Sequence, residues 1–417
     1  MPLFKKPIEQ EFFNLRLRAG RPMTELEFYA KELTGWETSP ERREMIDGDR
    51  YYTGDHDILK RQRTAIGPDG KLIVIENLPN NRIVDNQYAK HVDQKANYLL
   101  GQPISFSCEN DDYAAEVKKV LGMRFMRTLK SAGVECLNAG ISWLYPYYNK
   151  NGELAFRVFP GYEIMPFWSD AAHTELDSAL RLYPVEVYYG TEKKIVKKVD
   201  LFTLEGVTTY IFENGVLTPD TEKQAYVKVK DSKGNEQPLN WERFPLIPIK
   251  YNPKEVPLIR RGRSLQDAIN LLQSDFVNNM EEDVRNTVLV LKNYDGQDLG
   301  EFRRNLTTYG AIKVRTVEGT DGGVDSLEIS VNSENYKTVL ELLKKALIEN
   351  LRSYDAKDDR LSGTPNQMNI QSMYCDIDLD ANAMETELQA SFEEILWFVN
   401  TYLANTGKGS YESEDIT

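Results

Sequence analysis

Two helical patterns with a small insert between them constrain this chain more than any other feature. From Ser264 to Leu289, apolar side chains recur every three or four residues, the spacing that lines one face of a helix. At 1.5 Å per residue such a helix would be about 39 Å long. A second helix is expected from Ser333 to Ser353. The first stripe consists of Leu265, Ala268, Ile269, Leu272, Phe276, Met280, Val284 and Val288.

The two helices bracket a compact insert. It reads as a strand (VLVLKNY), a short helix (DLGEFRRNLTTY), a strand (AIKVRTV), a turn at Asp321-Gly322-Gly323 and a third strand (SLEISV). Ser264 is expected to cap the first helix, and the face opposite its apolar stripe is acidic and rich in amides. That face carries Asp275, Asn278, Glu281 and Glu282. A β-α-β-β module mounted on two helices suggests a stalk.

The region before the first helix, from Asp49 to Arg263, mixes helix and strand patterns. A helix is expected within NNRIVDNQYAKHVDQKANYLL, stopped by Gly101 and Pro103, and several short strands follow it. The prolines of the segment FPLIPIK, up to Lys250, confine it to a sheet edge or a linker. Residues 1–48 are charged and helix-prone, and a loosely packed arm and a functional role are both open for them.

The last part of the chain is strongly acidic. A polar stretch from Tyr354 to Asn369 holds no regular element, and a helical segment then runs from about Ile370 to Leu403. Between Arg360 and Lys408 the sequence has neither lysine nor arginine. The carboxylates of this window are Asp376, Asp378, Asp380, Glu385, Glu387, Glu393 and Glu394.

The charge of the chain limits how it can meet nucleic acid. Acidic residues outnumber basic ones by 65 to 51, for a net charge of -14, whereas proteins that grip DNA usually have a basic excess. The acidic helix is either an ordinary solvated surface or a wall that repels DNA and lets it slide. Lys357 and Arg360, just before it, are either loop charges or isolated contacts to phosphates.

Motifs of common enzyme classes are missing. The sequence has no P-loop, HExxH or GxSxG motif, and its three cysteines form no CxxC pair or Cys/His cluster. We therefore expect no cofactor, no zinc site and no disulfide framework. The sequence also shows no signal peptide and no run long enough to span a membrane, so we expect assembly in a reducing cytoplasm.

One cluster of aspartates leaves an enzymatic alternative open. Asp376, Asp378 and Asp380 are spaced closely enough to hold Mg²⁺ for phosphoryl-transfer or nuclease chemistry. On a helix, however, residues two apart point about 200° away from each other, so the three would not converge. The alternative to a metal site is a structural role, in which Asp378 caps the N-terminus of a helix and Asp380 lies in its first turn.

Three segments in the same order resemble the portal proteins of tailed bacteriophages, of the siphophage type. The first is RYYTGDHDILKR followed by NNRIVDNQYAKHVDQKANYLLGQPISF; the second is SLQDAINLLQSDFVNNMEEDVRNTVLVLKNYDG with DLGEFRRNLTTYGAIKV. The third is DDRLSGTPNQMNIQSMYCDIDLDANAMETELQASF. Together they cover most of residues 49–400.

The resemblance implies an α+β portal fold with named parts. Residues 1–48 would be an N-terminal arm and 49–263 a wing, and residues 264–289 and 333–353 would be two stem helices. Between the stem helices, residues 290–332 would form a clip. Residues 354–369 would be a tunnel loop and 370–403 a channel-side helix, followed by a C-terminal tail at 404–417. Because members of this family usually continue into a helical crown, the crown is expected to be short, absent or removed.

The resemblance also implies a function without catalysis. The chain would form a dodecameric ring at one capsid vertex of the virion, assembled in the host bacterial cytoplasm, and double-stranded DNA would pass through it. Its partners would be major capsid and scaffolding proteins, the large terminase and a head-tail adaptor, with no membrane. The expected tunnel-loop residues are Lys357, Arg360, Ser362, Gly363, Thr364 and Asn366. The expected acidic residues along the channel are Asp376, Asp378, Asp380, Glu385 and Glu387. The expected docking residues of the clip are Asn293, Phe302, Arg303, Arg304, Tyr309, Lys313 and Arg315. A shorter connector or adaptor protein of the virion is a further alternative.

Overall fold

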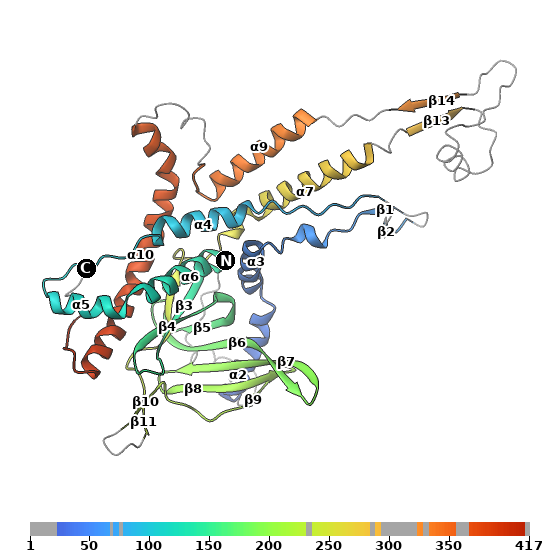
Figure 1. Cartoon of the computed structure of the whole chain (residues 1–417). Helices are drawn as coiled ribbons and strands as arrows, with labels where there is room; N and C mark the ends of the chain where they lie inside the picture. Colours follow the sequence, from blue (N-terminus) through green and yellow to red (C-terminus); the bar gives the residue numbers. More distant parts are fainter. Residues whose placement is uncertain are drawn as a thin grey trace. The chain divides into compact units, whose positions relative to one another are not determined.

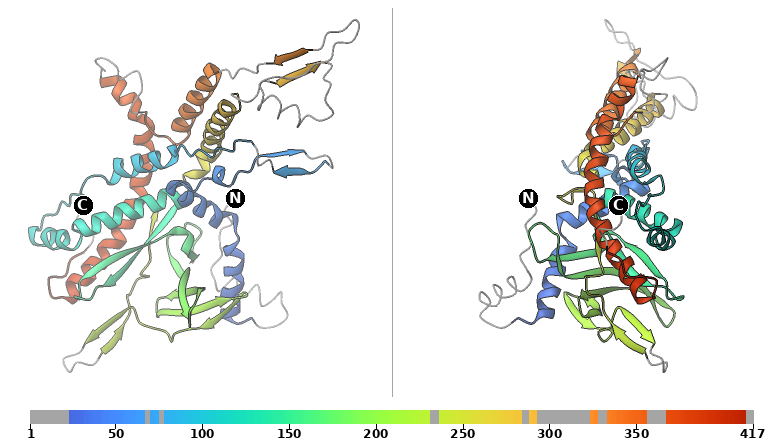
Figure 2. Two further views of the ribbon diagram at one scale, coloured as in Figure 1. Left: turned by 45° about the vertical axis from the view of Figure 1, so that its right-hand side comes forward. Right: turned by 90° about the vertical axis from the view of Figure 1, so that its left-hand side faces the viewer.

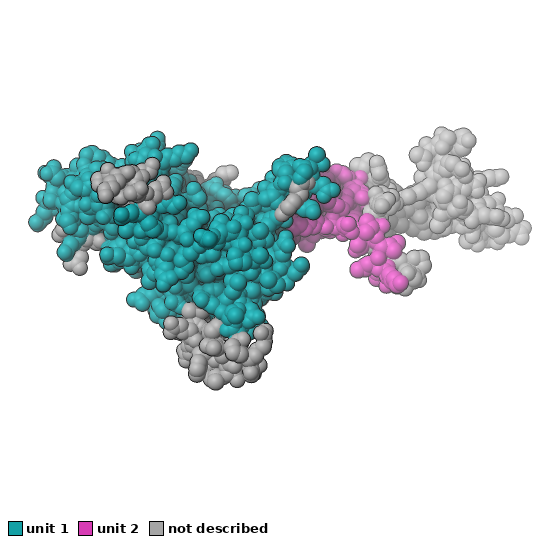
Figure 3. Space-filling model, turned by 90° about the horizontal axis from the view of Figure 1, so that it is seen from below, with its two compact units in different colours: residues 1–55, 86–264, 347–417 teal, residues 56–85, 265–346 magenta. Residues whose placement is uncertain are grey.

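The protein is described by a computed structural model that covers residues 23–66, 70–74, 78–230, 236–283, 288–292, 323–327, 333–355 and 367–412. Its internal contacts divide it into two units, coloured separately in Figure 3. Unit 1 is made of residues 1–55, 86–264 and 347–417, and unit 2 of residues 56–85 and 265–346. Helices and strands both contribute, as expected for an α+β chain.

Unit 1 combines helices with three sheets. Its helices are α2 (Glu25–Glu37), α3 (Pro40–Thr53), α4 (Gln87–Leu100), α5 (Asp111–Val120), α6 (Met123–Ala139) and α10 (Gln367–Asn405), with a short 3-10 turn η2 (Gly161–Glu163). A three-stranded sheet has the order β12 (Ile247–Lys250), β3 (Ile141–Tyr148), β4 (Leu154–Phe159). A five-stranded sheet runs β5 (Ile164–Trp168), β6 (Leu176–Tyr189), β7 (Glu192–Thr203), β8 (Gly206–Glu213), β9 (Val216–Pro219), and β10 (Val227–Lys230) pairs with β11 (Glu236–Leu239).

The five-stranded sheet is buried on both faces because its apolar residues alternate. Phe167 in β5 packs in a cluster with residues of α2, whereas the next residue, Trp168, packs with β3 and β4. The same alternation recurs in β7, where Leu201 belongs to the first cluster and Phe202 to the second. The sheet therefore lies between α2 and the three-stranded sheet (Figure 1).

The described part of the expected N-terminal arm belongs to the core of unit 1. Phe28 and Leu33 of α2 are fully buried against the five-stranded sheet, and Thr24 and Glu27 form a capping box at the start of the helix. The expected boundary at Asp49 lies inside α3, so it does not separate an arm from a wing. A loosely packed arm is thus wrong for residues 23–48, because their apolar side chains cover a sheet face.

Unit 2 contains short strands and most of two helices. A 3-10 turn η1 (Asp57–Lys60) precedes a hairpin of β1 (Thr64–Ile66) and β2 (Leu72–Val74). Helix α7 (Ile259–Asp283) and helix α9 (Ser333–Asn350) lie mostly in this unit, and β13 (Val288–Lys292) pairs antiparallel with β14 (Gly323–Leu327). The left view of Figure 2 shows the hairpin and the β13-β14 pair from a further direction.

Three boundaries in this region differ from expectation. Helix α7 begins at Ile259 rather than after Ser264, because Leu258 and Ile259 bury its start with 0% and 1% of their surface exposed. The helix ends at Asp283, and Val288 lies in β13, where it pairs with Leu327 instead of extending the helical stripe. Strand β14 begins at Gly323, inside the expected turn.

A fully buried row of α7 is polar, which the interpretation as an amphipathic helix did not predict, although Ile269 of the apolar stripe is buried as well. Gln266, Asn270, Ser274 and Asn278 recur every four residues and are at most 1% exposed. They contact the segment Asn81–Asp85, which is neither helix nor strand. Within the apolar stripe, by contrast, Met280 is 54% exposed.

These four side chains form a ladder along the backbone of Asn81–Asp85. Four residues of helix rise about 6 Å and two residues of extended chain advance about 6.6 Å, so alternate backbone groups meet successive ladder residues. Ser274 Oγ accepts from the amide of Ile83 at 3.0 Å. The other bonds run from the Asn81 amide to Asn278 Oδ1 at 2.7 Å, from the Asp85 amide to Asn270 Oδ1 at 3.0 Å, and from Gln266 Nε2 to the Asp85 carbonyl at 2.7 Å.

Replacing one ladder residue should destabilise unit 2. In Asn270→Ala, the Asp85 amide loses its acceptor inside a buried site, so we expect a loss of about 2 kcal/mol in the free energy of unfolding. Amide hydrogen exchange should also accelerate at Asp85. The matched control is Asn382→Ala, the same substitution at an exposed position of α10. Equal stability of the two variants in urea denaturation would contradict the ladder.

Candidate functional site

The expected tunnel-loop and clip residues lie outside the described residues, so their placement stays a prediction. For the tunnel loop this applies to Lys357, Arg360, Ser362, Gly363, Thr364 and Asn366. For the clip it applies to Asn293, Phe302, Arg303, Arg304, Tyr309, Lys313 and Arg315. The acidic residues expected to lie along the channel are all in α10 and are described.

The carboxylates of α10 are distributed around the helix rather than gathered on one face. Residues seven apart return to nearly the same side, which groups Asp380, Glu387 and Glu394. Asp380 is only 5% exposed, so it cannot be part of a solvent-facing acidic wall as expected. Asp376 and Glu385 are exposed.

Asp380 is buried at the centre of a network of cations. Its Oδ2 accepts from Lys95 Nζ in α4 at 2.8 Å and from the Tyr251 hydroxyl at 2.6 Å. Its Oδ1 lies 3.1 Å from the guanidinium of Arg261 in α7 and 3.7 Å from that of Arg352, which follows α9. The carboxylate thereby joins α4, α10, the segment after β12 and the start of α7 within unit 1.

Charge on Asp380 is maintained by the groups around it. Burial alone would raise the pKa of Asp380, but the charge and hydrogen bond of Lys95, the Tyr251 hydroxyl and the Arg261 charge together hold that pKa below its usual value. Burial lowers the pKa of the Lys95 ammonium, and the attraction to Asp380 only partly opposes that shift. The carboxylate is therefore the more firmly ionised partner.

The aspartates expected as an alternative metal site do not converge. Asp378 is hydrogen-bonded to the Tyr98 hydroxyl on α4, Asp380 is held by Lys95, and Asp376 is exposed. Across the ranges that the structure describes, no group of three or more His, Cys, Asp or Glu residues could hold a metal ion. As the helical geometry predicts, the three carboxylates point to different sides of α10.

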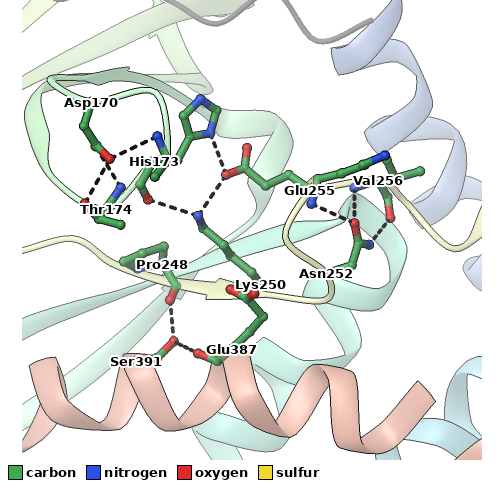
Figure 4. A network of polar contacts seen from close by, with 12 residues as sticks. Asp170, His173, Thr174, Pro248, Lys250, Asn252, Glu255, Val256, Glu387 and Ser391 are labelled. Atoms are coloured by element: carbon green, nitrogen blue, oxygen red, sulfur yellow. Dashed lines mark hydrogen bonds and ion pairs between the residues drawn. The ribbon is translucent and has the colours of Figure 1, made fainter. Parts of the chain in front are cut away.

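Further along α10, Ser391 attaches the helix to the edge of the three-stranded sheet. Its hydroxyl donates to the carbonyl of Pro248 in β12 at 2.6 Å (Figure 4). In the same strand, two residues after Pro248, Lys250 is 7% exposed. Its ammonium lies 3.2 Å from the Glu255 carboxylate and donates a hydrogen bond to the His173 carbonyl at 3.0 Å. The edge position expected for this segment from its prolines is confirmed.

His173 and Glu255 close this second polar network. Their side chains are 2.8 Å apart, and both residues have positive φ, 58° and 55°. Burial alone would raise the pKa of Glu255, but the hydrogen bond from His173 and the charge of Lys250 hold it below its usual value. His173 also stacks on Trp168 with 5.0 Å between ring centres. These contacts hold His173 as a packed part of the fold.

Sequence reasoning missed the partners of Asp380. Lys95 follows Val92 by three residues and Tyr88 by seven, so it lies on the apolar face of the expected helix. A lysine at such a position signals a buried cation that needs a carboxylate. Nothing in the spacing indicates which of the many distant carboxylates it meets, since Asp380 is 285 positions away.

Comparison with known proteins assigns the family. The family model for phage portal proteins of the SPP1 Gp6-like type matches residues 37–417. The chain belongs to this family. It is 29% identical over 371 residues to the portal protein of Bacillus phage SPP1, covering 89% of this chain and 72% of the relative. It is 26% identical over 400 residues to the portal protein of Clostridium phage phiCD119, covering 90% and 85%.

Membership settles the broad class of activity. Portal proteins are structural components of the phage particle, so the chain is not an enzyme. One solved structure with some likeness is described as the neck of a native GTA particle, computed with C12 symmetry. The match is 12% identical in sequence, covers 76% of this chain and 77% of the other chain, and has a TM-score of 0.34. Likeness at that level adds nothing to the family assignment. Within the described ranges, no helix combines the length and apolarity needed to cross a membrane.

Removing the charge of Asp380 should destabilise unit 1 strongly. In Asp380→Asn, Lys95 remains buried without its counter-charge, and we expect a loss of about 3 kcal/mol in the free energy of unfolding. Glu385→Gln is the matched control because it makes the same chemical change at an exposed position of α10. Urea denaturation of the three proteins measures the difference.

The same variant tests the direction of the pKa shift. Since the folded pKa of Asp380 is lowered, its contribution is complete above the unfolded value of about 4 and is lost as the pH falls through the folded value. The stability gap between wild type and Asp380→Asn should therefore be constant near neutral pH and shrink below about pH 4. A gap that widens in acid contradicts the ion network.

Proposed function

We propose that the chain forms the ring at one vertex of a phage capsid through which double-stranded DNA enters during packaging and leaves during ejection. The observation that carries this proposal is the match of the portal family model to residues 37–417. Two relatives named portal protein support it, since each aligns with about nine-tenths of the chain. The proposed location is the portal vertex of the virion, after assembly in the host bacterial cytoplasm.

The parts of a portal are assigned by order along the chain. Residues before α7 form the proposed wing, now including α2 and α3. Helices α7 and α9 form the proposed stem, with the clip between them at 290–332. The tunnel loop expected at 354–369 is proposed to end before α10, because that helix begins at Gln367. The clip is the proposed dock for the large terminase and later for a head-tail adaptor, while capsid and scaffolding proteins contact other surfaces of the ring.

Ring formation is supported by the apolar surface of unit 2. Of the seventeen exposed large apolar side chains in the described residues, nine lie in unit 2, although it is the smaller unit. Such a surface is unusual on a protein that stays monomeric, and contact with identical copies removes it from water. The nine are Leu59, Ile66, Leu72, Ile73, Val74, Leu271, Met280, Val339 and Leu342.

The charge of the chain suits DNA that passes without being held. A basic channel would bind the duplex by releasing its counterions, whereas carboxylates repel phosphates. Asp376 and Glu385 of α10 are exposed and supply that repulsion if the helix borders the channel. Asp380 is excluded from this role by its burial. Lys357 and Arg360 of the tunnel loop are the proposed isolated contacts to phosphate.

Charged substitutions in the apolar surface of α9 should prevent ring assembly. Val339 and Leu342 are 45% and 61% exposed, and Val339→Glu with Leu342→Glu places two carboxylates in the proposed subunit interface. We expect the variant to remain folded and monomeric under conditions in which the wild type forms rings, as measured by mass photometry. The control is Tyr188→Glu with Ile195→Glu, at similarly exposed positions of unit 1. Loss of rings in the control alone contradicts the assignment.

Removing the two tunnel-loop cations should affect DNA but not assembly. The double variant Lys357→Ala with Arg360→Ala should form rings normally and yield particles that package or retain less DNA, because the phosphate contacts are gone. DNA content per particle measures this effect. Lys118→Ala with Lys150→Ala, two exposed lysines of unit 1, is the control. Equal DNA content in all three kinds of particle refutes the proposed contacts.

A further inference from the structure

A hollow of about 1010 Å³ lies in unit 1 where four elements meet. Its walls come from the end of α5, the first two turns of α6, the β3-β4 hairpin and the region at the end of α10. A second hollow of about 420 Å³ shares Arg127, Thr128, Tyr147 and Phe156 with the first and adds Arg157. The two therefore form one continuous surface, which we name the α6 hollow.

The α6 hollow is positively charged, although the chain as a whole is acidic. Arg124 and Arg127 are exposed and form no ion pair with any described residue. Lys119 and Lys408 share a single carboxylate, Glu116, which Lys119 contacts directly and Lys408 approaches to 3.6 Å. The positive charge of the walls thus exceeds what the nearby carboxylates neutralise.

Few negative groups face the cations from inside the hollow. Among the described residues that line it, Glu153 alone is acidic, and its carboxylate accepts a hydrogen bond from Asn149 Nδ2 at 2.9 Å. Helix α6 begins at Met123 after Gly122, which has no side chain to cap the first turn. The partial positive charge of a helix N-terminus therefore adds to the two arginines, which sit in the first two turns.

The floor of the hollow is aromatic. Phe125 and Phe156 are 5% and 9% exposed and meet edge to face, with 5.2 Å between ring centres. Tyr147 borders both hollows, and the guanidinium of Arg157 lies over its ring at 5.1 Å. A ligand that fits this surface combines negative charges with apolar groups, because the arginines take carboxylates and the rings take hydrocarbon.

We propose that the α6 hollow binds an acidic peptide segment, with glutamate or aspartate side chains interspersed with apolar ones, from a protein that joins the ring during assembly. The identity of the partner rests on the proposed function, whereas the residues that line the hollow do not include those assigned to DNA passage. The arginines and the first turn of α6 hold the carboxylates of the peptide. Phe125, Phe156 and Tyr147 cover its apolar side chains.

Duplex DNA is a poorer match for the same cations. Charges are screened over about 8 Å at physiological ionic strength, so a short peptide in the hollow responds to the local cations alone. A duplex extends far beyond that distance and meets the rest of a chain with a net charge of -14. The phosphate backbone is also convex and rigid, and it cannot bring its charges onto an aromatic floor as a flexible peptide can.

The test uses the full chain and three fluorescent probes. The probes are a short peptide of glutamates interspersed with leucines, the same peptide with glutamine for every glutamate, and a short DNA duplex, each followed by anisotropy. The wild type should bind the glutamate peptide more tightly than either other probe. Arg124→Glu with Arg127→Glu should weaken that binding about tenfold or more, where tenfold equals about 1.4 kcal/mol. Both positions are in the first two turns of α6, where glutamate favours the helix.

The control variant is Lys118→Glu with Lys150→Glu, which changes the net charge equally at exposed positions outside the lining of the hollow. It should bind the glutamate peptide as the wild type does, and thermal unfolding checks that both variants are folded. The proposal is overturned if the wild type does not distinguish the two peptides, if both variants lose binding equally, or if the duplex binds more tightly than the glutamate peptide.

Discussion

A carboxylate can be buried in its charged form only where cations come to it, and Asp380 imposes that condition on unit 1. Lys95 must reach it from α4, Tyr251 from the segment after β12 and Arg261 from the start of α7. Packing of apolar side chains tolerates small shifts between elements, whereas hydrogen bonds of 2.6–3.1 Å to one carboxylate do not. These bonds therefore fix, together with apolar packing, how the elements that meet at Asp380 lie relative to one another within unit 1.

In unit 2, the polar side chains buried along α7 are uncharged. The amide and hydroxyl groups of Gln266, Asn270, Ser274 and Asn278 satisfy backbone groups of a segment that belongs to no sheet. Neutral hydrogen bonds cost less to desolvate than ion pairs, so a row of amide and hydroxyl side chains can be buried along α7. The apolar stripe of the same helix is divided, since Ile269 is fully buried whereas Met280 is exposed.

Local patterns in the sequence predict local structure here, and contacts between distant residues are where prediction fails. Alternation in β5 and β7 and the stripe of α4 depend on neighbours within a few residues, so they can be read directly. The pairing of Lys95 with Asp380 spans 285 positions, and no spacing rule selects it. The charged helix α2 was expected to be a loosely packed arm. Its few apolar residues are buried against a sheet that is distant in sequence, and that contact cannot be predicted from the helix alone. For the site, the residue patterns alone predicted neither a ring nor the passage of DNA; both expectations came from the family resemblance.

The ladder between α7 and the segment Asn81–Asp85 uses side-chain atoms of the helix and mostly backbone atoms of the segment. Its bonds to Ile83 and to Asp85 end on backbone atoms, which every residue type except proline provides alike. Ser274 and Asn270, on the other side, contribute specific oxygen atoms that an apolar residue lacks. Across related phages, the side chain at Ile83 is thus free to drift, whereas the helix positions that face it accept few substitutions. Within the segment, Asn81 and Asp85 are different, because their side chains also bond to Asn278 and to Gln273 of the helix.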